Sequence, residues 1–320
     1  MRGAHRAGRC GGDGRLSLGA GMNTASGARV LEVDEALTEG FLRYASEHGV
    51  AHDNSYLAPE DLARFDPAAE PATVVVDGSG TVIGAASVML DGYLSEGISR
   101  LRILHALDPA YYPALIDHAL ARIPEQAERV LLFLPEHAGD VEDAVAAAGF
   151  AMCRRAYVLR HFDPKYAPEP QFPSEVHLEQ ATPAVAIDWA HVANAAFRGS
   201  PGRYDMTPDH VRELLARDRI IPEGSFIAHR EGVPAGLVLT LSDARDPCTA
   251  EIETLAVAPA MQGKGLGRAL LLTALRAVGR AGCRSVSLSV STYNRRAVAL
   301  YLGAGFRAED VRVCWERTRA

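Results

Sequence analysis

The chain has 320 residues, of which 48% are hydrophobic, and it carries a formal net charge of −7. A chain of this length and apolar content can bury enough surface for about two domains. The acidic balance argues against general nucleic-acid binding, which needs a basic face, and no apolar run reaches the roughly 18 residues of a membrane span. We therefore expect a cytoplasmic protein that binds neither nucleic acid nor membranes.

The first 27 residues differ from the rest of the chain. Residues 1–20 contain four arginines and several glycines, and they lack the apolar segment that a signal peptide requires. A second methionine, Met22, comes just before the first run with an ordered pattern. We expect residues 1–27 to be disordered, or to precede the true start of translation.

The cysteines show no metal-ligand or redox-motif spacing, and one pair of histidines is spaced as metal ligands would be. Five cysteines are scattered without Cys-x-x-Cys pairs, which predicts reduced thiols in a reducing cytosol. His48 and His52 are four positions apart, but Gly49 lies between them and no third ligand is evident. We predict two loop histidines and no metal.

A proline-rich connector divides the chain. Residues 163–173 contain four prolines, which favour an extended, semi-rigid segment, and we predict a linker at 164–173. The following residues alternate between strand and helix signals. Thr182-Pro183 and Thr207-Pro208 each place an N-cap residue before a proline in the first turn of a helix. We predict strands at 174–179, on both sides of 231–232, up to 257, at 284–290 and at 310–316, and helices at 182–197, from 207, at 266–281 and at 295–304.

The segment Gln262-Gly-Lys-Gly-Leu-Gly267 lies between a predicted strand and a predicted helix. Its glycines let the backbone approach a ligand without interference from Cβ atoms. They also leave N–H groups free at the positive end of a helix dipole. This loop is an anion cradle whose natural ligand is a phosphate or pyrophosphate. A Walker loop is excluded because Lys264 is followed by Gly265, and a Rossmann fingerprint is excluded because Arg268 stands where the third glycine belongs.

After a strand ending Leu255-Ala-Val257, the pattern Gln-x-x-Gly-x-Gly resembles the pyrophosphate loop of the GNAT superfamily of acyl-CoA N-acetyltransferases. Further along, residues 294–306 are similar to the Asn…Ala…Leu-Tyr…Gly-Phe segment of the same family. The order and spacing of the two motifs both match. The resemblance covers roughly residues 174–317 and implies an α/β fold.

An internal repeat relates the two parts of the chain. Gly149-Phe150 and Gly305-Phe306 differ by 156 positions, and at the same offset Val130–Leu134 falls on Val286–Val290. We predict two tandem GNAT-like domains at 28–163 and 174–320, each a mixed, mostly antiparallel sheet flanked by helices. This layout is similar to that of mycothiol synthase, a member of the family.

The first copy lacks the ligand signals. At an offset of 156 the glycine loop falls on Ala106–Tyr111, where Asp108 is an N-cap residue and Pro109 removes a donor. Asn294 and Tyr301 fall on Ala138 and Val145. We expect a structural or substrate-framing first domain, with the cofactor bound only in the second.

The resemblance implies acetyl-CoA as the acyl donor. The backbone of 255–257 would bind the pantetheine arm as though it were an added strand, Asn294 would contact the same arm, and the loop would hold the pyrophosphate. The implied cofactor contacts are Leu255, Ala256, Val257, Gln262, Gly263, Lys264, Gly265, Leu266, Gly267, Arg268 and Asn294.

The resemblance also implies the catalytic groups. Glu251 or Glu253 would be the general base, and strand alternation puts both on one face unless a bulge lies between them. Both also fit solvated charges near a strand end. Tyr301 falls on the tyrosine that acts as general acid in the family, and it equally fits a packing residue one turn from Phe306.

The acceptor should be a primary amine, most simply a small molecule. Its predicted contacts are Phe197, Arg198, Arg203 and Tyr204, in a segment whose composition equally fits an exposed connector. Two alternatives stay open: a non-catalytic acyl-CoA-binding regulatory module, and an enzyme that acetylates a protein N-terminus or lysine. We expect a monomer or homodimer.

Overall fold

The structure is a computed structural model that describes residues 27–48, 65–67, 69–90, 97–199, 205–243 and 246–319. The predicted tail up to residue 26, as well as His52, Arg203 and Tyr204, lies outside the described residues. His48 is not in a loop, because it is the last residue of the first helix, where its ring stacks on His105 with centroids 4.9 Å apart. Among the described helices, none is both long and apolar enough to cross a bilayer.

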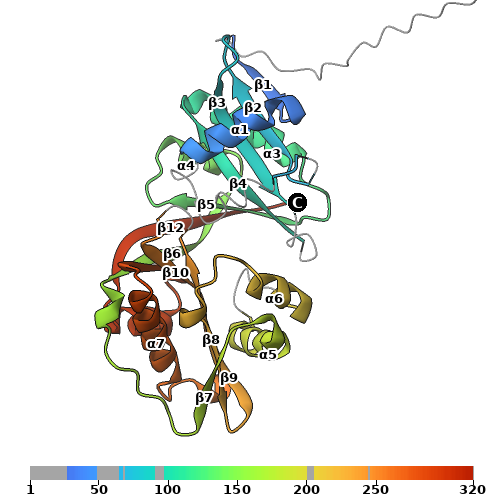
Figure 1. Cartoon of the computed structure of the whole chain (residues 1–320). Helices are drawn as coiled ribbons and strands as arrows, with labels where there is room; N and C mark the ends of the chain where they lie inside the picture. The colour runs from blue at the N-terminus through green and yellow to red at the C-terminus, as the bar shows by residue number, and fades with distance from the viewer. Residues whose placement is uncertain are drawn as a thin grey trace, which may run out of the picture.

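Two lobes lie one above the other in Figure 1. The N-terminal lobe holds β1 (Arg29–Glu32), α1 (Glu35–His48), β2 (Ala72–Val76), β3 (Val82–Met89), β4 (Ile98–Ala106), η4 (Pro109–Tyr111), α3 (Tyr112–Ala121), β5 (Arg129–Pro135) and α4 (Asp140–Ala147). Strand β6 (Ala151–Phe162) and the short η5 (Pro164–Tyr166) follow. The C-terminal lobe holds β7 (Val176–Gln180), η6 (Pro183–Val185), α5 (Ala186–Phe197), α6 (Pro208–Leu215), η7 (Pro222–Gly224), β8 (Phe226–Arg230), β9 (Val233–Ser242), β10 (Thr249–Val257), η8 (Pro259–Met261), α7 (Leu266–Arg280), β11 (Ser285–Ser291), α8 (Arg295–Gly303) and β12 (Arg307–Thr318).

The internal repeat is confirmed by the element boundaries. Strands β5 and β11 begin and end 156 residues apart, and so do β6 and β12. The helix signals in the second half also hold in part. The Thr207 side chain accepts a hydrogen bond from the His210 N–H at 3.2 Å and caps α6, whereas Thr182 makes no side-chain cap.

The two lobes exchange their last strands. One twelve-stranded sheet runs in the order β1-β2-β3-β4-β5-β12-β6-β11-β10-β9-β8-β7. Strand β12 therefore pairs with β5 of the N-terminal lobe, and β6 pairs with β11 of the C-terminal lobe. Leu159 of β6 is buried in the C-terminal core, while Trp315 of β12 packs against the N-terminal core. The sequence did not predict this exchange, and boundaries at 163 and 174 describe the repeat along the chain rather than the two cores.

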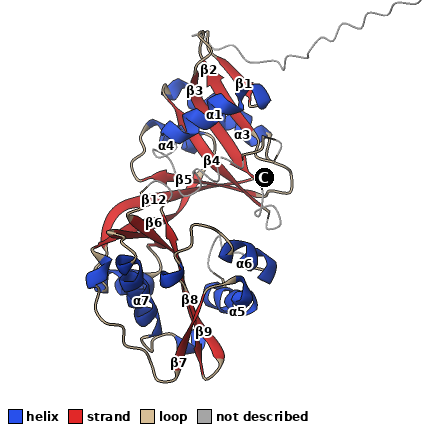
Figure 2. Cartoon of the chain, viewed as in Figure 1, coloured by secondary structure: helices blue, strands red, loops and turns tan. Residues whose placement is uncertain are grey.

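Helices cover both faces of the sheet in each lobe (Figure 2). Alternate residues of a strand point to opposite faces, and in β8 Ile227 packs with α5 and α6 whereas Ala228 packs with α7. In β2, Val74 packs with α1 and Val75 with α3. Only β4–β5 and β10–β11 are parallel pairs among the described strands. The predicted fold class, two mixed and mostly antiparallel halves flanked by helices, is confirmed.

The proline-rich linker is held against α7. The Arg276 guanidinium donates to the Ala167 carbonyl at 2.8 Å and pairs with the Glu169 carboxylate. Gly279 faces the linker backbone so closely that a Cβ there would come within 2.6 Å of the Lys165 Cα. The linker is therefore a packed part of the C-terminal lobe.

Gly279→Ala is expected to lower the free energy of unfolding by about 2 kcal/mol or more, because the new methyl group meets backbone atoms that cannot rotate away. Urea denaturation would measure this loss. Gly303→Ala is the matched control, since the nearest atom to its added Cβ is the Arg268 guanidinium at 4.0 Å, an ordinary contact distance, and it should leave stability unchanged or slightly raised. Equal stability of the two variants would mean that the linker is not packed on α7 in solution.

Candidate functional site

Strands β10 and β11 diverge in the middle of the C-terminal lobe. They pair only where Thr249, Ala250 and Glu251 meet Ser285, Val286 and Ser287. Beyond Glu251, β10 continues to Val257 paired only with β9. Backbone groups on the β11 side of residues 252–257 are thus left without a strand partner, which suits an extended ligand that adds as a strand. The predicted contacts Leu255, Ala256 and Val257 lie along this edge.

A β-bulge separates the two candidate bases. Ile252 pairs with Thr240 and Thr254 pairs with Leu239, so Glu253 is an extra residue. Glu251 pairs with Leu241, which packs with α5 and α6, and directly paired residues share a face. Glu251 therefore lies on the α5–α6 face, and Glu253 is the exposed residue of the bulge. The alternation that placed both glutamates on one face does not hold across this bulge.

The glycine loop leads directly into α7. Gly263 and Gly265 have φ values of +76° and +86°, and a Cβ on either would meet no atom within 4 Å. These glycines are required by their backbone conformation, which L-residues avoid. At Gly267 space is tight, since a Cβ there would lie 3.3 Å from a methyl group of Val257. Among the described residues, the N–H groups of 263–267 meet no hydrogen-bond acceptor.

The unpaired N–H groups of this loop stand at the N-terminus of a helix of 15 residues. An anion gains both hydrogen bonds and a favourable dipole at such a place. The loop is also exposed at Gly263, Lys264 and Gly265, so a ligand can reach it. Such a loop would suit a phosphate or pyrophosphate group, and the binding of one stays a prediction.

The Gln262 side chain links the loop to the end of β10 and to α8 by hydrogen bonds. Its side-chain nitrogen donates to the Val257 carbonyl at 3.1 Å, and its side-chain oxygen accepts from Arg296 of α8 at 3.2 Å. Arg296 is exposed and brings a cation beside the loop. Sequence reasoning overlooked this residue, although it belongs to the Asn-Arg-Arg run that was singled out.

Two predicted cofactor contacts have structural partners. Arg268 donates to the Gly303 carbonyl at the end of α8 at 3.0 Å. The Asn294 side-chain oxygen caps α8 by accepting from the Ala297 N–H at 3.1 Å. Arg268 thus joins α7 to the end of α8, whereas Asn294 caps α8 itself, and their predicted contacts with a cofactor stay predictions.

Tyr301 lies on α8 in the core on the α7 face of the C-terminal lobe. It is 7% exposed and its ring meets Phe306 edge-on, with centroids 5.8 Å apart. The same buried cluster contains Leu288 and Val290, which belong to the diverging end of β11. Tyr301 is therefore a packed residue beside the gap between β10 and β11.

The predicted acceptor segment is described only at its edges. Phe197 ends α5 and packs against the α5–α6 core, and Arg198 is exposed at the C-cap. Asn194 holds the far end of this connection, because its amide donates to the Met206 carbonyl at 3.0 Å and accepts from the Met206 N–H at 2.8 Å. Its described edges, Phe197 and Met206, pack on the face of the sheet that also carries Glu251. Arg203 and Tyr204, the other two predicted contacts, are outside the described residues.

The N-terminal lobe has a shorter connection at the corresponding place. Helix η4 runs directly into α3, whereas residues 262–265 separate η8 from α7. Matching the loop to Ala106–Tyr111 is therefore wrong, because Ala106 ends β4 and corresponds to Val257. The Asp108 carboxylate caps η4 by accepting from the Ala110 N–H at 2.9 Å, as predicted. A capped and shortened turn offers no anion cradle.

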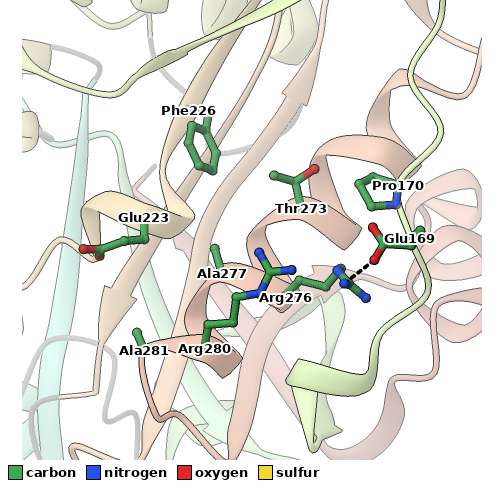
Figure 3. Close-up of a pocket in the computed structure, with 9 residues that line it drawn as sticks. All are labelled: Glu169, Pro170, Glu223, Phe226, Thr273, Arg276, Ala277, Arg280 and Ala281. Carbon is green, nitrogen blue, oxygen red and sulfur yellow. Dashed lines mark ion pairs between the residues drawn. The ribbon is translucent and has the colours of Figure 1, made fainter.

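A cavity of about 520 Å³ lies on the outer side of α7, between the linker and β8. Figure 3 shows Arg276 and Arg280 projecting from α7 there, with Arg276 paired to Glu169. None of the predicted site residues lines this cavity. The chemistry of the glycine loop, rather than the size of this cavity, identifies the candidate site.

Comparison with known proteins identifies the family and the fold of the region that holds these residues. The family model described as the acetyltransferase (GNAT) family matches residues 188–306, which include the diverging strands, the glycine loop and α8. Among solved structures, a GCN5-related N-acetyltransferase from Sphaerobacter thermophilus has a TM-score of 0.70 at 20% identity, covering 91% of this chain and 95% of that one. A tandem GNAT protein from the clavulanic acid biosynthesis pathway has a TM-score of 0.67 at 17% identity, covering 91% and 98%. At these identities the structures support the fold.

Curated relatives carry the name mycothiol acetyltransferase. The one from Beutenbergia cavernae is 31% identical over 89% of this chain and 93% of its own length. The one from Acidimicrobium ferrooxidans is 30% identical over 80% and 85%. The match to the one from Frankia alni, at 33% identity, spans 57% of this chain and 60% of that protein. Because two of these relatives, at 30% and 31% identity, match over 85% and 93% of their own length, the chain belongs to the GNAT family of acetyltransferases.

Proposed function

We propose that this chain transfers an acetyl group from acetyl-CoA to the primary amine of a small molecule, acting in the cytoplasm and binding the cofactor only in its C-terminal lobe. The observation that carries the proposal is the run of N–H groups at 263–267, which lacks acceptors among the described residues and stands beside the gap between β10 and β11. The shortened, Asp108-capped turn of the N-terminal lobe supports a single site.

The residues present fit acetyl-CoA. The glycine loop and the dipole of α7 would hold its pyrophosphate, Arg296 and Lys264 would add positive charge, and the free edge of 252–257 would hold its extended arm. Bound there, acetyl-CoA supplies the acetyl group as a thioester.

Two side chains of this protein would carry out the proton transfers. Glu251 would take a proton from the acceptor ammonium, directly or through water, so that the nitrogen lone pair can form the new C–N bond. The Tyr301 hydroxyl would give its proton to the sulfur as the C–S bond breaks, because a phenol is protonated at neutral pH. Glu251 shares its face of the sheet with the acceptor segment, and Tyr301 lies on the opposite face. The two groups therefore flank the gap between β10 and β11.

Incubation of the full chain with acetyl-CoA and a panel of amines would test the proposal. The panel should include aminoglycosides, lysine peptides and peptides with free N-termini. The amine precursor of mycothiol is added because the relatives are named mycothiol acetyltransferase. Mass spectrometry should show one class of small amine acetylated. Acetylated peptides alone would favour a protein acceptor. Acetyl-CoA binding without any acetylated product would favour a regulatory module.

Tyr301→Phe should lower kcat and kcat/KM together by about 100-fold while the Kd for acetyl-CoA stays nearly constant. The ring that packs on Phe306 is retained, so only the hydroxyl is lost. Steady-state kinetics and calorimetry on the same preparation would separate the two quantities. A wild-type kcat on a true substrate, with chemistry shown to be rate-limiting, would reduce Tyr301 to a packing residue.

Glu251→Gln should lose rate chiefly at low pH, where the amine is mostly protonated and needs a base. The deficit should shrink as pH rises, because solution then supplies free amine. Glu253→Gln is the matched control: the same change in the bulge should leave the pH–rate profile near that of the wild type. Reversed behaviour of the two variants would assign the base to Glu253.

A further inference from the structure

Two cysteines meet where the exchanged strands cross between the lobes. In the β6–β12 ladder Cys314 pairs with Arg154 and Trp315 pairs with Met152, so Cys153 is the extra residue of a bulge. The Cys153 Sγ donates a hydrogen bond to the Cys314 carbonyl at 3.3 Å. Two thiols far apart in the chain are thereby held on neighbouring strands at the middle of the sheet.

The two thiols differ in exposure. Cys153 is exposed, whereas Cys314 is 1% exposed and packs with Ile98 and Leu131 of the N-terminal lobe. A dissolved reagent can therefore reach Cys153 first. Cys314 is shielded from a dissolved reagent by its burial.

Charged and hydrogen-bonding neighbours activate Cys153. The neighbouring Cys314 side chain lowers the pKa of Cys153 to about 7, and Arg154 on β6 and Arg129 on β5 act in the same direction. Burial and Glu316 on β12 oppose them. Arg129 is itself held by a double hydrogen bond to Glu316, at 2.8 and 2.7 Å. The neighbouring Cys153 side chain and deeper burial raise the pKa of Cys314.

A second pair of cysteines provides an internal comparison. Cys248 precedes β10 and Cys283 precedes β11, and both are half-buried. Burial raises the pKa of Cys283, and nearby Cys248 and Asp246 raise it further. Because the thiolate is the reactive form, Cys283 should be far less reactive than Cys153 at neutral pH.

We propose that Cys153 is a site of reversible oxidation by hydroperoxides, and that Cys314 resolves the oxidised thiol into a disulfide joining β6 to β12. The Cys153 thiolate attacks one peroxide oxygen, so that an S–O bond forms, the O–O bond breaks and the departing oxygen takes up a proton as water. The Cys314 sulfur then attacks the Cys153 sulfenic acid, forming the S–S bond and expelling the hydroxyl, which leaves as water with the Cys314 proton. Two thiols and one hydroperoxide give a disulfide and two product oxygens, as water or alcohol, and a dithiol reductant reverses the step.

The disulfide would lock the crossing between the lobes. It would connect residues 161 positions apart on the two strands that each lobe lends to the other. A cross-link over so long a separation restricts the unfolded chain strongly, so the oxidised protein should melt at a higher temperature. The site is independent of the acetyl-transfer proposal.

Alkylation by iodoacetamide at a series of pH values, resolved by peptide mass spectrometry, tests the first step. The alkylation rate of Cys153 should reach half its maximum near pH 7. For Cys283 the midpoint should lie above the ordinary pKa of a cysteine thiol. Peptide resolution also separates Cys10, which lies outside the described residues. A Cys153 midpoint equal to that of Cys283 would overturn the proposal.

Hydrogen peroxide at equimolar concentration, followed by non-reducing peptide mapping, tests the second step. The wild type should yield a peptide joining Cys153 to Cys314, which dithiothreitol removes. Cys314→Ser should instead leave a sulfenic acid at Cys153 that a 1,3-diketone probe traps, and Cys283→Ser should behave like the wild type. Thermal melts would show that each variant is folded, with Cys314→Ala as a second variant. Over-oxidation of Cys153 without any joined peptide in the wild type would overturn the proposal.

Discussion

Acetyl-CoA is expected to bind the wild-type chain at a stoichiometry near one and to lose at least about 100-fold in affinity when Gly265 becomes Val. Gly265 is the N-cap of α7 with φ +86°, a conformation that a β-branched residue avoids. The substitution therefore moves the loop, and its side chain also occupies the space that the pyrophosphate would fill. Each hydrogen bond between an N–H group and the charged phosphate contributes about 1.5–3 kcal/mol, so losing two of them accounts for the expected change.

Gly282→Val is the matched control for this experiment. Gly282 has φ +102° and open space around its Cβ position, so Val there brings similar backbone strain. It follows the opposite end of α7 and should destabilise the chain without weakening acetyl-CoA binding. Calorimetric titration would measure both variants. Undiminished affinity in Gly265→Val would place the cofactor elsewhere, and a wild-type stoichiometry near two would refute a single site.

Cutting the chain between the lobes is expected to leave both pieces in one folded particle. Ser174 and Glu175 form an exposed turn just after the linker, where a protease recognition sequence can be inserted. After cleavage each piece still supplies the strand that completes the other lobe, since β12 pairs with β5 and β6 pairs with β11. Size-exclusion chromatography should show a single peak at the mass of the uncut protein.

The strand exchange is what keeps the two pieces together. Denaturant should separate them, because unfolding breaks the β5–β12, β12–β6 and β6–β11 ladders at once. In an isolated second piece, β12 would have to take the place of β6 beside β11. This is unfavourable, because at the repeat offset Trp315 and Arg317 would replace Leu159 and His161, which are both buried. Free separation of the pieces in native buffer would mean that each lobe keeps its own last strand.

The family, the glycine loop and most elements of the second half could be predicted from the sequence. These features are local: the glycines need only their own φ angles, and a helix face needs only its period. Leu271, Leu275 and Val278, which recur at helical spacing in the sequence, are all fully buried. The hairpin at 231–232 and the last helix also lie where the pattern placed them. The repeat offset of 156 held from β5 to β6, where the two halves have no gap.

Only the tertiary structure decided which strands and side chains pair with one another. Strands β6 and β12 are copies of one repeat pattern, so the pattern by itself does not say which lobe each strand joins, and only the packed sheet assigns β6 to β11 and β12 to β5. The bulge at Glu253 depends on the register with β9, which the β10 sequence does not encode by itself. The guanidinium of Arg268 turns to Gly303, 35 residues away, rather than to the adjacent loop. Local periodicity fixes which face of an element is apolar, whereas the choice among equivalent neighbours is set by contacts between residues distant in the chain.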